Sequence, residues 1–308
     1  MIEGILTIDH ADEAAGVPRA LGYLVPRQNA KIRARLHPTA IAGVWAWQTA
    51  FALLAAYPSA ALVGAAYGND PRGDAPLGAS GALALLDFLR TNVHGVGAAA
   101  AGTALVTIAA VLAGLLPLAA LMTTMAHATH GGHRIGASRA IGGAVGSGRA
   151  LAGLLVSVGG AEALAVGAAV VLGGVAESSA HAWLGEAHAQ MLAVAIGAVA
   201  LVPACAIGVV HDLARAAVVR LQLGTLAAWI AGYRSFRAAP IDLAWSWGWR
   251  ALASLAPVGV VALLADRLSW RGGWALLALA LLHQAVVLIR VALRSSWLAK
   301  ALRTVDLS

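Results

Sequence analysis

Long apolar segments separated by short polar ones dominate the pattern of this 308-residue chain. A helix needs about 20 mostly apolar residues to cross a bilayer, and six segments approach or exceed that length. We predict membrane spans at about 40–66, 97–126, 150–175, 190–210, 251–265 and 274–293. The pattern therefore predicts an all-α integral membrane protein, a six-transmembrane-helix bundle whose membrane domain occupies 40–293.

The segments outside these spans are expected to form arms and surface helices. Residues 1–39 are predicted to be a cytoplasmic N-terminal arm, and residues 294–308 a cytoplasmic tail. Repeated Arg, Leu and Trp positions in 212–248 favour amphipathic interfacial helices on the cytoplasmic side. The similar sequences RALAGL and RALASL, which start at Arg149 and Arg250, suggest three helical hairpins, although an Ala- and Leu-rich chain also produces such matches by chance.

The overall composition agrees with a membrane protein. Hydrophobic residues make up 60% of the chain and charged residues 11%, with a mean hydropathy of +0.79, whereas about a quarter of a soluble domain is charged. Arginine far outnumbers lysine, a bias of GC-rich genomes that favours a bacterial inner membrane. The single cysteine, Cys205, lies in a predicted span, so we expect neither a disulfide framework nor a thiolate metal site.

The positions of the basic residues predict how the chain is threaded. With the N-terminus inside, the inner segments hold 17 Lys and Arg residues and the outer loops hold 4, as the positive-inside rule requires. We therefore expect both termini to be cytoplasmic and the inner face to contact anionic lipid. The net charge of +7 then reflects topology, and no nucleic-acid partner is expected. Seven tryptophans are predicted to anchor the helices at the membrane interfaces: Trp45, Trp47, Trp245, Trp247, Trp249, Trp270 and Trp274.

One acid, Glu162, lies in the middle of the third predicted span. A charge at the bilayer centre costs on the order of 2.5–3.5 kcal/mol on insertion scales, so we expect its side chain to face the bundle interior. His283 and Gln284 lie at a similar nominal depth in the sixth span, which predicts a Glu162–His283 pair with Gln284 nearby. Such a pair would either pin two helices together or act as a proton relay or coupling site.

Three histidines, His127, His130 and His133, follow the second predicted span. Steps of three residues drift around a helix, and Gly131-Gly132 favours a break, so the histidines do not form a single ligand face. A loop could still wrap them around a metal, and His127 with His211 could hold haem between helices. We expect no cofactor, because no acidic or cysteine residue lies beside the histidines to complete a metal site.

No phosphate-binding loop, zinc-protease motif or nucleophile elbow occurs in the sequence, so we do not expect an enzyme. The favoured hypothesis is a non-catalytic membrane subunit or scaffold that docks a partner protein at the inner face, or that assembles as a homo-oligomer. The alternative is a small permease or transport component that uses the mid-membrane Glu and His residues. A third hypothesis is a membrane enzyme that acts on lipid through the inner histidines.

Overall fold

The computed structural model describes residues 32–69, 81–127, 136–267 and 273–305. All regular structure in these ranges is helical, which confirms the all-α class. Five helical segments within them are long and apolar enough to cross a membrane, the arrangement of a multi-pass membrane protein: Pro38–Tyr67, Val93–Ala126, Ala137–Leu184, Glu186–Leu221 and Leu277–Thr304. Six spans were predicted, and the segment 251–265 is not among the five.

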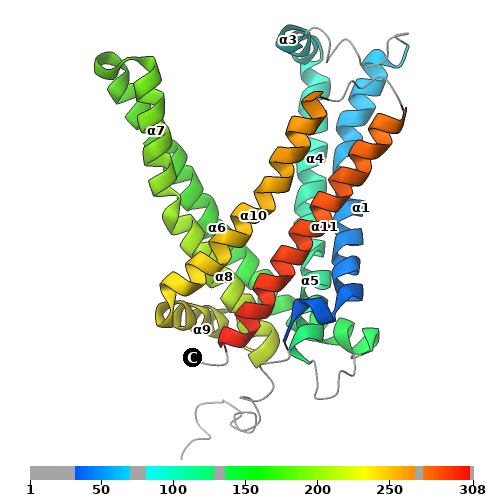
Figure 1. Ribbon diagram of the computed structural model, residues 1–308, viewed down its shortest axis with the longest axis vertical. Helices are drawn as coiled ribbons and strands as arrows, with labels where there is room; N and C mark the ends of the chain where they lie inside the picture. Colours follow the sequence, from blue (N-terminus) through cyan, green and yellow to red (C-terminus); the bar gives the residue numbers. More distant parts are fainter. Residues whose placement is uncertain (1–31, 70–80, 128–135, 268–272, 306–308) are drawn as a thin grey trace, which may run out of the picture.

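The first half of the chain makes three passes along the length of the molecule (Figure 1). We call the end at which the first long helix begins the basal end, and the opposite end the distal end. The helices in this half are the short η4 (Ala34–Leu36), α1 (Pro38–Tyr67), α3 (Gly81–Thr91), α4 (Val93–Ala113), α5 (Leu115–Ala126) and α6 (Ala137–Leu184). Helix α1 runs to the distal end, α4 and α5 return, and α6 runs to the distal end again.

The second half returns to the basal end and adds a final hairpin. Its helices are α7 (Glu186–Ala200), α8 (Val202–Leu221), α9 (Thr225–Ala238), α10 (Pro240–Arg267) and α11 (Gly273–Thr304). Helices α7 and α8 run to the basal end, α9 lies across that end, and α10 and α11 pack side by side as they run out and back. Arg303 Nη1 donates a hydrogen bond to the carbonyl oxygen of Ile32 at 2.8 Å, so the first and last described segments meet at the basal end.

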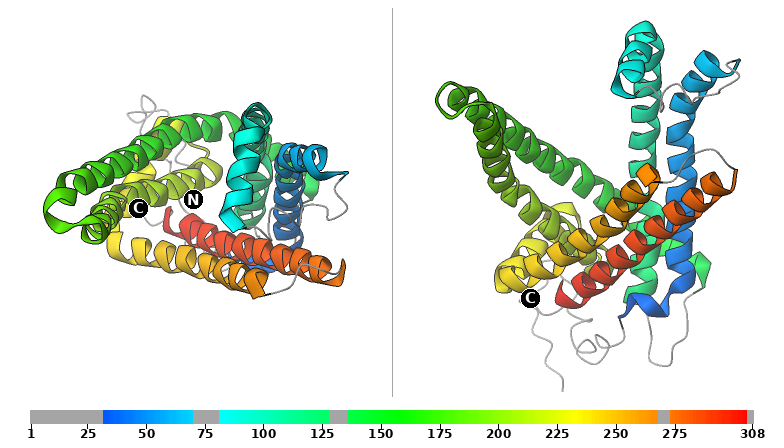
Figure 2. Two further views of the ribbon diagram at one scale, coloured as in Figure 1. Left: turned by 90° about the horizontal axis from the view of Figure 1, so that it is seen from above. Right: turned by 45° about the horizontal axis from the view of Figure 1, so that its top comes forward.

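The core lies toward the basal end, around α8. Every residue of α8 from Val209 to Val219 is buried, and this helix packs against α5, α6, α9, α10 and α11. Toward the distal end the α6–α7 hairpin diverges from the other helices (Figures 1 and 2). The helices therefore form a closed bundle at the basal end and spread apart toward the distal end.

Several helices extend beyond the predicted boundaries. Helix α6 has 48 residues, a length of about 70 Å, which exceeds the roughly 30 Å of bilayer hydrocarbon. Helix α8 continues through the start of the predicted connection 212–248, and α11 continues through most of the predicted tail 294–308. Both extensions are packed in the core, where Asp212 of α8 pairs with Arg294 of α11.

Candidate functional site

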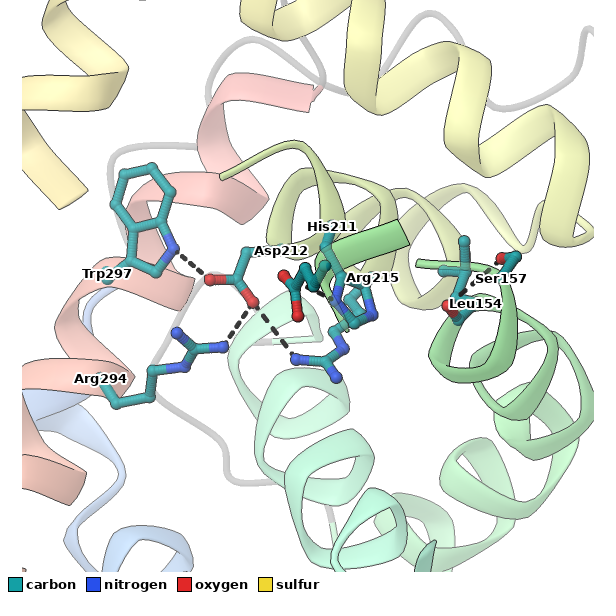
Figure 3. Close-up of polar contacts among 8 residues, drawn as sticks. Leu154, Ser157, His211, Asp212, Arg215, Arg294 and Trp297 are labelled. Atoms are coloured by element: carbon teal, nitrogen blue, oxygen red, sulfur yellow. Dashed lines mark hydrogen bonds and ion pairs between the residues drawn. The ribbon is translucent and has the colours of Figure 1, made fainter. Parts of the chain in front are cut away.

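Asp212 is a buried carboxylate at the contact between α8 and α11. It is 1% exposed, and its two oxygens accept hydrogen bonds from both helices. Arg294 Nη2 donates to Oδ1 at 2.5 Å and Trp297 Nε1 donates to Oδ2 at 2.9 Å. Arg215, one turn along α8, also donates to Oδ1, at 3.3 Å. Figure 3 shows Asp212 between these three donors.

This arrangement satisfies the requirements for burying an ion. A carboxylate taken out of water is costly unless opposite charge and hydrogen bonds replace its hydration, and hydrogen bonds between charged groups are the stronger kind. Arg294 and Trp297 lie on α11, whereas Asp212 lies on α8. The contacts therefore fix the position of α11 against the central helix.

Glu162 of α6 lies beside His211, the residue that precedes Asp212. Glu162 Oε1 is 3.9 Å from His211 Nδ1, and the side chains are 37% and 5% exposed. A Cβ atom at Gly208, one turn earlier on α8, would lie 3.4 Å from the same oxygen, so the carboxylate rests directly on α8. His211 Nε2 and Arg215 Nε are buried without a hydrogen-bond partner in the described part of the chain.

The expected Glu162–His283 pair does not form. His283 is exposed on α11 and makes no polar contact within the described ranges, while Gln284 Oε1 accepts a hydrogen bond from Thr49 Oγ1 of α1 at 2.9 Å. The pair was predicted from equal depth along two spans. Depth does not say which helices are neighbours, and α6 packs against α8 while α11 packs against α1, α8 and α10.

A cavity of about 440 Å³ adjoins this ion cluster between α1, α5, α10 and α11. Its polar lining includes Gln48, Arg250, Ser254, Arg290 and Arg294, and none of the described residues that line it is acidic. A second cavity, of about 430 Å³, shares part of this wall, including Gln48 and Arg294. Arg294 of the ion cluster therefore lines both cavities.

The three cavity arginines differ in their partners. Arg294 is paired with Asp212. Arg250 donates to Ser246, at 2.6 Å to both the carbonyl oxygen and Oγ, and to Ser296 Oγ at 2.9 Å. Arg290 forms neither a hydrogen bond nor an ion pair with any residue that the structure describes. The guanidinium of Arg290 is therefore free to bind a ligand in the cavity.

Of the three histidines that were weighed as metal ligands, the structure describes one. His127 directly follows α5, is exposed, and has its Nδ1 3.0 Å from the carbonyl oxygen of Thr123. His130 and His133 lie outside the described residues. Among the residues that were placed, no group of three His, Cys, Asp or Glu side chains could hold a metal ion.

The predicted tryptophan anchors fall into two groups. Trp47, Trp245, Trp249 and Trp274 are exposed, and Trp45 and Trp247 are partly buried against the core. Trp270 lies outside the described residues. Trp297, which is 1% exposed, was not among the predicted site residues. Its spacing from Arg290 and Arg294, at i, i+4 and i+7, places all three on one helix face and is the signal that could have identified them.

Comparison with protein-family models, with curated proteins and with solved structures gives no match for this chain.

Replacing Asp212 by asparagine should destabilise the protein strongly, because Arg215 and Arg294 would lose their buried counter-charge. We expect a loss of about 3 kcal/mol, near the lower end for breaking a buried ion pair since Arg294 is partly exposed. Asp242→Asn is the matched control, because its contact with Lys300 involves a carboxylate that is 67% exposed and should be worth less than about 1 kcal/mol. Unfolding in a mixed-detergent titration measures both, and equal losses would contradict the assignment.

Proposed function

We propose that this chain is a six-span membrane transport component that binds an anionic solute in the cavity lined by Arg250, Arg290 and Arg294. The observation that carries the proposal is a hollow between helices with three guanidinium groups and no acidic group among its described lining residues. Basic residues within membrane helices are costly and typically mark a pathway or a binding site.

The chemistry of the lining suits a small carboxylate, sulfate or phosphate group. Arginine presents a planar fork of donors that matches such anions, and Arg290 has no competing partner among the described residues. Gln48 and Ser254 add neutral polar groups, and Val44, Leu118 and Leu121 provide apolar walls. A volume of about 440 Å³ lies within the range of small-molecule sites, roughly 300–1,000 Å³.

Helix α10 supplies the sixth span in this proposal. The first and last described segments meet at the basal end, where Arg303 contacts Ile32, and two ends on one side require an even number of crossings. Five helical segments are long and apolar enough, and α10 packs against α11 as its outgoing partner. We place the basal end in the cytoplasm of a bacterium by the positive-inside rule and the arginine bias.

Cysteine labelling in sealed vesicles tests this threading. In a Cys205→Ser background, Leu36→Cys and Arg237→Cys should react from one side, because both sites are exposed near the basal end. Trp183→Cys and Trp274→Cys, both exposed at distal helix ends, should react only from the other side. Labelling of Trp274→Cys from the same side as Arg237→Cys would mean that α10 does not cross the bilayer.

Replacing Arg290 by glutamine tests the binding site. Purified protein in lipid vesicles should take up at least one of labelled sulfate, phosphate or succinate faster than protein-free vesicles. Arg290→Gln should slow that uptake roughly tenfold or more, since a hydrogen bond to a charged group contributes about 1.5–3 kcal/mol. The matched control is Arg237→Gln, an exposed arginine on α9 outside the cavity. Equal uptake by the Arg290→Gln and wild-type proteins would contradict the proposed site, and a wild-type rate no faster than empty vesicles would contradict transport.

A docking subunit or scaffold is the second candidate function. Helix α9 lies across the basal end, and Leu226, Ile230 and Tyr233 leave large apolar or aromatic side chains exposed on it, at 74%, 42% and 46%. Their spacing at i, i+4 and i+7 puts them on one face, which suits a protein partner or a second copy of the chain. This function does not need an occupied cavity, so normal cellular activity of an Arg290→Gln protein would favour it.

A further inference from the structure

Beside the anion cavity, the structure holds a set of ionisable groups whose charges balance. Asp212 and Glu162 are the acids and Arg215 and Arg294 the bases of this set, with His211 next to Glu162. With both acids and both arginines ionised, the formal charges sum to zero when His211 is neutral. One added proton on Glu162 or His211 therefore gives the cluster a net charge of one positive unit.

We infer that Glu162 and His211 form a proton-binding site linked to anion binding in the neighbouring cavity. The inference rests on the proposed function and deepens it. A bound proton supplies the positive charge that a bound anion neutralises, so each ligand should favour binding of the other. Linkage of this kind is reciprocal: if protons strengthen anion binding, the anion strengthens proton binding equally.

Arg294 and Trp297 provide the physical connection between the two sites. Both line the cavity, and both donate hydrogen bonds to Asp212, the residue that follows His211. An anion that binds Arg294 competes with Asp212 for the same guanidinium. Arg294 and Arg215 also act electrostatically on both Glu162 and His211.

The Glu162–His211 contact has the open geometry that a proton site needs. At 3.9 Å the pair is within ion-pair range but too long for a hydrogen bond, and Glu162 is partly exposed whereas His211 is nearly enclosed. The buried Nε2 of His211 has no partner among the described residues. Glu162 therefore offers a partly exposed carboxylate for a proton, beside an imidazole whose charge state would respond to it.

Three charged groups in the described part of the chain act on the Glu162–His211 pair. The groups that do so are Arg215 and Asp212 of α8 and Arg294 of α11, and α5, which also packs against α6 and α8, carries no ionisable residue. The charged groups on α7, α9 and α10 lie away from the pair or have other partners. Glu186 and His188 lie near the distal start of α7, and Arg234 and Arg237 are exposed on α9. Asp242 is paired with Lys300, and Arg250 is bonded to Ser246 and Ser296.

The test measures anion affinity against pH with the purified full-length protein. Sulfate is the first probe, because its charge is constant between about pH 5.5 and about pH 8, a range that includes the ordinary titration of histidine. Nanodiscs of phosphatidylcholine with and without phosphatidylglycerol form a second arm, which shows whether the anionic group comes from a free ion or from a lipid headgroup. For the wild type, affinity for whichever anion binds should rise roughly tenfold as the pH falls, a typical coupling between two sites.

Glu162→Gln is the decisive variant, since glutamine resembles the protonated acid. We expect the variant to bind the anion at about pH 8 as tightly as the wild type does at about pH 5.5, and to lose most of the pH dependence. A merely structural role for Glu162 would weaken binding at every pH instead. Glu186→Gln, at an exposed acid at the start of α7, is the matched control and should keep the wild-type profile.

Calorimetry of the wild type in two buffers of different ionisation enthalpy keeps the test valid if Glu162→Gln does not fold. Anion binding should take up part of a proton. Anion binding that is independent of pH and takes up no proton would overturn the proton site and leave the proposed anion cavity standing. The absence of any binding of sulfate, phosphate, succinate or anionic lipid by the wild-type protein would overturn both.

Discussion

The compensated burial of Asp212 is the interaction on which the rest of this structure depends. The central helix α8 carries a carboxylate into the core at 1% exposure, and α11 supplies Arg294 and Trp297 to meet it. In a membrane, few water molecules are present to replace these partners. Because Asp212 needs donors from α11, that helix continues past the predicted end of its span. The same contacts position Arg294 and Trp297 in the wall of the cavity.

The sequence predicted the fold class and the location of the apolar segments, but not where the helices end. Hydropathy counts each charged residue as a break, so Asp212 and Arg294 were assigned to a surface connection and to a tail. In the structure they cancel each other inside the bundle. A single segment contains no information about its partner on another helix, and for the same reason Glu162 was matched with His283 and not with His211.

The proposed transport site and the proposed proton site share the same central helix. His211 and Asp212 are adjacent on α8, and one faces the acid of α6 while the other faces the arginine of α11. The α6–α7 hairpin diverges from the rest of the molecule toward the distal end, so α8 joins its tightly packed and its open parts. A change of charge at His211 or Asp212 would therefore act both on the helices that line the cavity and on the α6–α7 hairpin.

The most direct test of the central interaction is a double-mutant cycle between Asp212 and Arg294. Unfolding free energies of the Asp212→Asn, Arg294→Gln and doubly substituted proteins would be measured in the same detergent. The account predicts a coupling of at least about 1 kcal/mol, because removing either partner leaves the other uncompensated. Losses that add within about 0.5 kcal/mol, as they do for independent sites, would contradict it.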